Sequence, residues 1–181
     1  MTDILSLASR KRIYEHVETH SGCHLREIGR KCEVPLGTAL YHLDRLEAEG
    51  LISVRRDGRY KRYFPANGLG RRDKDFLSAF RHSVPRRVAN QLLGTGAPDV
   101  RVAMTQRELC AAIGVSRSTL SFHVNSLIER GILRREPARP ENRYVLDDAE
   151  LTLQILTKYR DSLGDVGPIK APEPAPIAVE A

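Results

Sequence analysis

The chain has 181 residues, of which 41% are hydrophobic and 6% aromatic, and it contains no tryptophan. This length fits one or two small domains with largely aliphatic cores, and no apolar run approaches the roughly 18 residues of a membrane span. The net charge of +6 divides into +9 over residues 1–160 and −3 over residues 161–181. A basic body favours a polyanionic partner, although charge alone also fits a soluble basic protein without one.

Three cysteines, Cys23, Cys32 and Cys110, stand at wide spacing, which is unlike a disulfide framework. They indicate reduced thiols in a reducing compartment, and we expect Cys110 to be buried like a small apolar residue. The N-terminal segment MTDILSLASRKR lacks the apolar stretch of a signal peptide. We therefore expect a cytoplasmic protein that has no contact with a membrane.

An internal repeat is the most informative feature of the sequence. Residues 26–52 align without gaps on residues 107–133 at an offset of 81, so that His42 matches His123 and Gly50 matches Gly131. Upstream the offset falls to 75, and we place the about six extra residues of the second copy in the loop 94–104. Two copies of one unit predict two domains of one fold.

Each copy has the same predicted elements in the same order. In the first copy they are helices over about 9–20, 25–31 and 36–49, followed by a hairpin over 51–64. In the second they are helices over about 85–93, 106–113 and 117–130, followed by a hairpin over 132–146. Gly50 and Gly131 are typical of left-handed helix ends, and Asp57-Gly58 is typical of a two-residue hairpin loop. This order indicates a winged helix-turn-helix.

The predicted fold class is therefore mainly α with small β-hairpin wings (α+β), built as two tandem winged helix-turn-helix domains. The segments are a first domain (1–70), a linker helix (71–83), a second domain (84–147), a C-terminal helix (148–163) and a disordered tail (164–181). Phe76, Leu77 and Phe80 share a face of the linker helix, which we expect to pack against one or both domains. The tail is rich in Pro and Ala and has little to bury.

The third helix of each copy separates an apolar stripe from a face that is free to meet a DNA groove. The stripes are Leu36, Ala39, Leu40, Leu43 and Leu46 in the first copy and Leu120, Val124, Leu127 and Ile128 in the second. In ordinary winged helices the N-terminal residues of this helix read base edges. The second copy has SRST (116–119) at this place, whereas the first has PLGT (35–38), with one hydroxyl and no charge.

The segment HLREIGRKCEVPLGTALYHLDRLEAEGLISVRRDGRYKRYF resembles the ArsR- and MarR-like winged-helix transcription regulators, especially archaeal tandem forms. The segments FRHSVPRRVANQLL and SRSTLSFHVNSLIERGIL are similar to the same group, so the resemblance covers residues 5–146. It implies a regulator that contacts double-stranded DNA through recognition helices and basic wings. It also implies a homodimer through the C-terminal helix, because terminal helices often form the dimer interface in such relatives. The alternative is a helix that folds back on its own domain.

The residues that we expect to contact DNA lie on the recognition helices and the wings. They are Thr38, Tyr41, Arg45, Arg55, Arg56, Arg59, Lys61, Arg62, Ser116, Arg117, Ser118, Thr119, Phe122, Arg134 and Arg143. Arg117 is suited to guanine, and Ser116 is also suited to the helix N-cap. His42 and His123 recur at one place, where partial burial with a backbone hydrogen bond competes with phosphate contact.

The first wing concentrates the cations. With Asp57-Gly58 as the loop, Arg56 lies directly opposite Arg59, and like charges across strands destabilise a hairpin. Phosphate would neutralise them; the alternative is a basic edge that blocks strand pairing. In the turn before the third helix, Glu33 takes the place of Gly114, where we expect a left-handed backbone that is costly for a residue other than glycine.

Other chemistries have less support in the sequence. His16, His20, Cys23, His24 and Cys32 supply ligands suited to zinc, but no CxxC pair occurs, so we expect no metal and no cofactor. No Gly-rich phosphate loop, HExxH or GxSxG motif occurs, and we expect no enzyme. The rival to a DNA-binding regulator is a winged-helix protein-interaction scaffold in a nucleic-acid-associated assembly.

Overall fold

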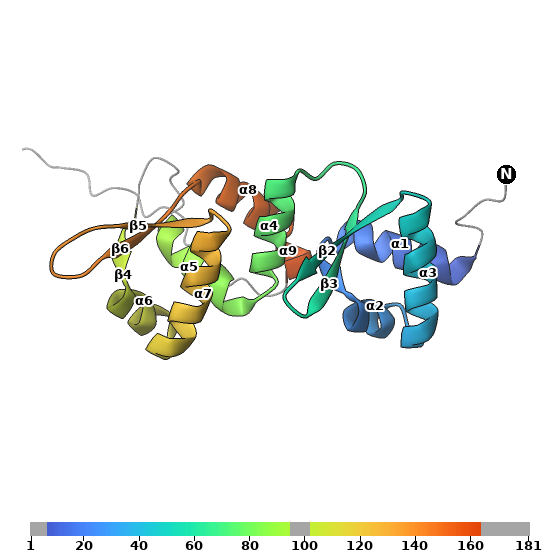
Figure 1. Cartoon of the computed structure of the whole chain (residues 1–181), viewed down its shortest axis with the longest axis horizontal. Coiled ribbons are helices and arrows are strands. Elements are labelled where there is room, and N and C mark those ends of the chain that lie inside the picture. The colour runs from blue at the N-terminus through green and yellow to red at the C-terminus, as the bar shows by residue number, and fades with distance from the viewer. Residues whose placement is uncertain (1–6, 95–101, 164–181) are drawn as a thin grey trace, which may run out of the picture. The chain divides into compact units, whose positions relative to one another are not determined.

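The structure is a computed structural model that describes residues 7–94 and 102–163 (Figure 1). The described residues form two compact units, one of residues 7–81 with 161–163 and the other of residues 82–94 with 102–160. Most of the predicted loop 94–104 and the whole predicted tail 164–181 lie outside the described residues. In the described part, no helix combines the length and the apolar character needed to cross a bilayer.

The first unit has the predicted helices and hairpin, together with one short strand. Its elements are α1 (Ala8–Thr19), β1 (Cys23–His24), α2 (Leu25–Lys31), α3 (Leu36–Ala48), β2 (Ile52–Asp57), β3 (Tyr60–Pro65) and α4 (Arg71–Phe80). The three strands form an antiparallel sheet in the order β1-β3-β2. The helix-turn-helix is α2 and α3, and the wing is the β2–β3 hairpin.

The second unit repeats this order. Its elements are α5 (Ser83–Leu93), β4 (Met104–Thr105), α6 (Gln106–Ile113), α7 (Arg117–Glu129), β5 (Leu133–Glu136), β6 (Arg143–Leu146) and α8 (Ala149–Lys158). Its sheet has the equivalent order β4-β6-β5. A last short helix, α9 (Arg160–Leu163), follows α8. Two copies of one topology confirm the predicted fold class.

Equivalent positions of the repeat fill the two cores. Ile28 and Leu109 are buried on the short second helices, and Tyr63 and Tyr144 are buried on the last wing strands. On the third helices the buried pairs are Ala39 with Leu120, Leu43 with Val124, and Leu46 with Leu127. The 81-residue repeat therefore records a shared core, because the matched apolar residues are those that each unit removes from water.

The short strands β1 and β4 were not expected from the sequence. Cys23 pairs with Tyr63 and Met104 pairs with Tyr144. Each short strand therefore forms the edge of its sheet, beside the second strand of the wing. A strand of two residues is too short to show the alternation of apolar and polar residues by which a strand is predicted from sequence. Each strand also runs directly into a helix N-cap, where His24 accepts from Glu27 N and Thr105 accepts from Glu108 N.

The expected linker and C-terminal helices are shorter and differently divided in the structure. The residues of the predicted linker up to Arg81 belong to the first unit, where Phe76, Leu77 and Phe80 of α4 are buried. The predicted C-terminal helix is two helices, since α8 ends at Lys158 and α9 follows. The side chain of Arg81 donates to Glu27 at 2.8 Å and to the Ser162 carbonyl at 3.1 Å, which holds α9 to the first unit.

The turn before α3 has the expected left-handed residue. Glu33 has φ +53°, and it is the only residue other than glycine with positive φ in the described part of the chain. Its counterpart Gly114 has φ +63° and ψ +45°. This backbone costs a residue with a Cβ roughly 1–2 kcal/mol, and glycine adopts it freely.

Replacing Glu33 by glycine should therefore raise the free energy of unfolding by about 1 kcal/mol. Urea denaturation of the full chain measures the change. The reciprocal control is Gly114→Ala, which should lower the free energy of unfolding by a similar amount. Nothing lies within 4 Å of a Cβ built at Gly114, so the control reports backbone strain alone. A Glu33→Gly variant no more stable than the parent would show that this turn stores no strain.

Candidate nucleic-acid interface

The N-terminus of α7 presents the polar residues that were expected to read DNA. Ser116 is the N-cap, and its hydroxyl accepts from Thr119 N at 3.2 Å. The same hydroxyl lies 3.0 Å from Ser118 Oγ and 2.8 Å from Thr119 Oγ1. Ser116 therefore caps the helix, while Arg117, Ser118 and Thr119 are exposed on its first turn.

Arg117 extends from this turn over the side of the second unit. Its side chain is 76% exposed, and its Nη2 lies 3.6 Å from Glu141 Oε1. Its Nε donates to Gln106 Oε1 at 3.3 Å. One turn further along the same helix, Phe122 is 72% exposed with its ring edge-on to His123. The surface of α7 thus combines a held guanidinium, two hydroxyls and an aromatic ring.

The equivalent surface of α3 is less polar at its start. Thr38, Tyr41 and Arg45 are exposed as expected, but Leu36 and Leu40 are exposed as well, at 48% and 37%. Placing these two leucines on the core stripe was wrong. The repeat shows the contrast directly, because Leu36 stands where α7 has Arg117 and Leu40 where α7 has Ser121.

His42, and not Leu40, is buried in the core. Arg10 Nε donates to His42 Nδ1 at 3.4 Å, so the ring proton lies on Nε2, which is 2.9 Å from Ser9 Oγ. Burial, and secondly the charge of Arg10, lowers the pKa of His42. The burial alternative therefore holds for His42, with side-chain rather than backbone partners. His123 is half-buried beside His82, and burial lowers its pKa too.

The loop of the first wing is Gly58-Arg59, not Asp57-Gly58. Asp57 pairs with Tyr60, so Arg56 lies opposite Lys61 and not opposite Arg59. Gly58 has φ +58° and Arg59 is not among the residues with positive φ, as a type II′ turn with glycine at its first loop position requires. Arg56, Arg59 and Lys61 are exposed around this turn, and like charges still face each other across the strands.

Two arginines of the first wing make structural contacts, and for the buried Arg62 this corrects the expected role as a DNA contact. Arg62 is only 3% exposed; its Nε pairs with Asp57 Oδ2 at 3.0 Å and its Nη1 donates to the Gly22 carbonyl. Arg55 pairs with Asp75 at 2.9 Å and donates to the Arg71 carbonyl. Arg62 thus ties the turn after α1 to the wing, and its buried guanidinium is not accessible to DNA. Arg55, whose side chain is 31% exposed, ties the wing to α4.

The second wing also carries exposed and half-exposed cations. Arg134 of β5 pairs with Glu136 at 2.9 Å, and both side chains are about half exposed. Arg143 of β6 is exposed, and its Nη1 donates to the Ala103 carbonyl at 3.1 Å. Arg143 matches Arg62 in the repeat, but the ion-pair partner of Arg62 is Asp57, and the residue that matches Asp57 is Ala138, which has no carboxylate.

The histidines and cysteines considered as zinc ligands are not gathered into a site. Among the described residues, no group of three or more His, Cys, Asp or Glu side chains is placed to hold a metal ion. His16 and His20 stack at 4.3 Å, and burial lowers the pKa of His16 to about 4. Cys23 is fully buried, and burial raises the pKa of its thiol to about 12.

The apolar residues of the C-terminal helix are already covered within the chain. Ile155 and Leu156 are buried, and α8 packs against α5 of the same unit. The alternative of a helix that folds back on its own domain therefore holds for these residues. Ile155 is therefore not accessible for a dimer contact, and the homodimer itself stays a prediction.

Each unit places a surface helix beside an antiparallel wing, and this geometry defines tandem winged helix-turn-helix proteins. A family model described as an N-terminal HTH domain matches residues 8–77. The MarR family model matches residues 87–143. The two models agree with two tandem helix-turn-helix domains, the second of them similar to the MarR family, as the resemblance found in the sequence implied.

Curated proteins with similar sequences agree with this class. An uncharacterized HTH-type transcriptional regulator of Methanocaldococcus jannaschii, MJ1398, is 24% identical over 143 residues, which cover 79% of this chain and 34% of that protein. LexA repressors of Limosilactobacillus fermentum and Limosilactobacillus reuteri are 34% identical over 71 residues and 39% identical over 67. These matches cover 39% and 36% of this chain and 34% and 27% of the repressors. The chain thus spans about a third of the length of these relatives.

Proposed function

We propose that the protein binds double-stranded DNA, reading bases with α7 of the second unit and gripping phosphates with the wing of the first. The observation that carries this proposal is the exposed start of α7, where Arg117, Ser118 and Thr119 follow the N-cap. A major groove admits one helix, and arginine and hydroxyl side chains at the N-terminus of that helix are the groups that read base edges.

The first wing has the complementary chemistry. Arg56, Arg59 and Lys61 lie exposed around a tight turn, with Arg56 directly opposite Lys61. Repulsion between these charges is relieved when phosphates approach, because phosphate neutralises them. Phosphate contacts contribute affinity but carry no direct sequence information. Thr38, Tyr41 and Arg45 of α3, and Arg143 of the second wing, are proposed as further contacts of this kind.

Arg117→Ala tests this division of labour. The change should cost about 1–3 kcal/mol on a selected site and much less on scrambled duplex, because a bidentate contact with a base is lost. Titrations of both duplexes at fixed salt measure the two losses. Arg130→Ala, at the end of the same helix, is a control that should change neither affinity. Equal losses on both duplexes would make Arg117 a phosphate contact and refute its role in base reading.

A protein-interaction scaffold is the second candidate function, and one observation favours it. Leu36 and Leu40 are exposed one helical turn apart on α3, at the places where α7 has Arg117 and Ser121. Contiguous exposed apolar residues are typical of protein-binding surfaces. A scaffold without DNA chemistry predicts no binding to duplex at low salt, whereas the DNA-binding proposal requires it. It remains a prediction that the protein is cytoplasmic and that it is not an enzyme.

A further inference from the structure

In the described part of the chain, the most exposed large apolar side chain lies on a recognition helix. Phe122 of α7 is 72% exposed, and Tyr41, at the same position of the repeat in α3, is 57% exposed. Single hydrophobic residues on a surface are common and need no special explanation. Here the 81-residue repeat places an exposed aromatic ring at one position of both recognition helices. The aromatic position is therefore a feature shared by the two domains.

Phe122 lies on the side of α7 that faces away from the core. At about 100° per residue, it is roughly opposite the buried Leu120 and Val124. Ser118 and Asn125 lie about one turn before and one turn after it on the same side, and both are exposed. In helices that enter a major groove, residues at this spacing along one face contact successive bases. The ring therefore lies among the side chains that meet base edges when α7 occupies a groove.

The residue that follows Phe122 holds its ring. The ring centroids of Phe122 and His123 are 5.2 Å apart, and the ring planes meet at 78°. Tyr41 and His42 repeat this pair in the first unit, at 5.4 Å and 58°. His123 is half-buried, and burial lowers its pKa, so the imidazole is neutral at pH 7. A neutral imidazole adds no charge that would attract phosphate, and the surface around the ring is apolar.

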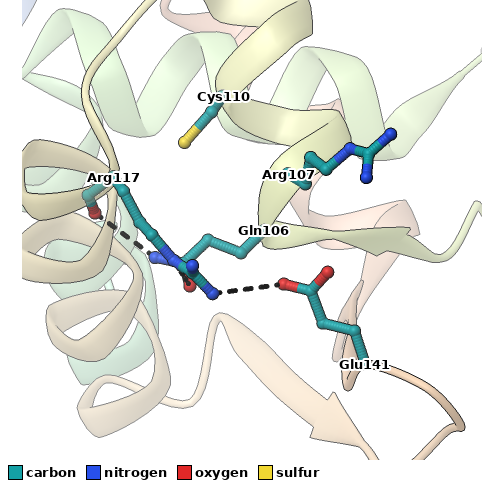
Figure 2. A pocket seen from close by; sticks show the side chains of 5 residues that line it. All are labelled: Gln106, Arg107, Cys110, Arg117 and Glu141. Carbon is teal, nitrogen blue, oxygen red and sulfur yellow. Dashed lines mark hydrogen bonds and ion pairs between the residues drawn. The ribbon is translucent and has the colours of Figure 1, made fainter.

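Arg117 occupies a different part of the helix surface. Figure 2 shows its guanidinium beside Gln106 and Glu141, at a small pocket on the side of α7. Cys110, which also lines this pocket, is half-buried, so the expectation that it is buried was wrong. At about 100° per residue, Arg117 and Phe122 are about 140° apart around the helix. We therefore expect these two side chains to meet different base pairs.

The chemistry of a phenyl ring limits what Phe122 can contact in DNA. The ring has no hydroxyl or other group that forms an ordinary hydrogen bond, whereas the hydroxyl of Tyr41 can donate to a phosphate. In the major groove, the 5-methyl group of thymine is the apolar group that base edges present to a side chain. Packing the ring against this methyl group removes apolar surface of both partners from water, which stabilises the complex. In unmodified DNA only thymine supplies such a partner.

We propose that Phe122 packs against the 5-methyl group of a thymine in the major groove, and that the specific site of the protein contains a thymine at this place. The residue then determines specificity without forming a hydrogen bond. This inference rests on the proposed function, because it requires α7 to lie in the major groove. It adds a thymine to the guanine for which Arg117 is suited, at a separate base pair.

Replacing thymine by deoxyuridine tests the contact by removing a single methyl group. A duplex selected from random sequences by the full chain is prepared in several versions, each with one thymine replaced by deoxyuridine, which keeps the same base-pairing groups. The parent protein should bind at least one version about three- to tenfold more weakly, because the burial of a methyl group contributes roughly this factor. Replacement of thymines that α7 does not contact should leave the affinity unchanged.

Three variants connect this effect to the ring. Phe122→Ala should bind the thymine and deoxyuridine versions of the sensitive position equally, and Phe122→Leu, which keeps an apolar side chain, should retain part of the difference. Arg117→Ala is the matched control. It should bind the selected duplex more weakly and still distinguish thymine from deoxyuridine, because it contacts another base pair. Since Phe122 is exposed, its replacement should leave the midpoint of urea denaturation unchanged.

Several results would overturn the proposal. One is a selected duplex without thymine, or one in which no replacement by deoxyuridine changes the affinity. Another is a Phe122→Ala variant that distinguishes the two bases as the parent does, or that loses affinity equally for selected and scrambled duplex. A parent protein that binds no duplex at low salt would refute the proposed function and this inference with it. Binding that does not depend on the methyl group would refute the inference alone.

Discussion

Arg62→Ala should lower the free energy of unfolding by about 3–5 kcal/mol, because it removes one partner of a buried ion pair and leaves the other without compensation. The side chains of Arg62 and Asp57 are 4% and 11% exposed, and their atoms Nε and Oδ2 are 3.0 Å apart. The substitution also removes the donor to the Gly22 carbonyl, in the turn that joins α1 to β1. The first unit therefore loses a side-chain contact between its wing and this turn, which the bond from Gly22 N to the Tyr63 carbonyl still joins.

Urea denaturation of the full chain, followed by circular dichroism, measures this effect. Arg59→Ala is the matched control, because Arg59 lies exposed in the same hairpin and its loss should change stability by less than about 0.5 kcal/mol. The double variant Asp57→Ala with Arg62→Ala should be less destabilised than the sum of the two single variants, since no charge is left buried. Equal stability of Arg62→Ala and the parent would show that Arg62 is a surface cation after all.

Replacing Arg56, Arg59 and Lys61 together by alanine should weaken binding to duplex DNA by roughly a hundredfold or more at about 0.1 M salt. Each phosphate contact contributes about 0.9 to the slope of log affinity against log salt, so three lost contacts should make the slope shallower by about 2.7. Because these contacts do not read sequence, the selected and scrambled duplexes should lose affinity by similar factors.

A second triple variant controls for the loss of net charge. Lys11→Ala, Lys158→Ala and Arg160→Ala remove three exposed cations from α1 and the C-terminal helices, outside both wings. This variant has the same formal charge as the wing variant, and it should keep most of the affinity and nearly all of the slope. If both variants lost affinity equally, the wing would act only through the overall charge, and the proposed phosphate contacts would be wrong.

The sequence predicted the elements and the repeat because both depend on short-range patterns. Matched apolar residues at Leu43 and Val124, and glycines at the left-handed helix ends Gly50 and Gly131, fix each unit locally. The strained Glu33 was also predictable, since its repeat partner is a glycine. These features need no knowledge of which residues meet across the fold.

The errors concern residues whose role depends on a distant partner. Asp57-Gly58 resembles a hairpin loop, but the ion pair with Arg62 holds Asp57 in the strand and moves the loop by one residue. His42 enters the core in place of Leu40 because Ser9 and Arg10 of α1 satisfy its ring nitrogens. Hydrophobic periodicity does not reveal such partners. In the sequence, an arginine that pairs with a buried carboxylate cannot be distinguished from one that contacts phosphate.

The titration of full-length protein with a random duplex across a range of salt concentrations tests the central claim most directly. A protein that contacts about five phosphates should bind at about 50 mM salt and lose affinity with a log–log slope of about −4 to −5. The measurement needs no knowledge of the operator, because phosphate contacts operate on any sequence. Absence of binding at that salt concentration would contradict the DNA-binding account and favour a scaffold that uses Leu36 and Leu40 of α3.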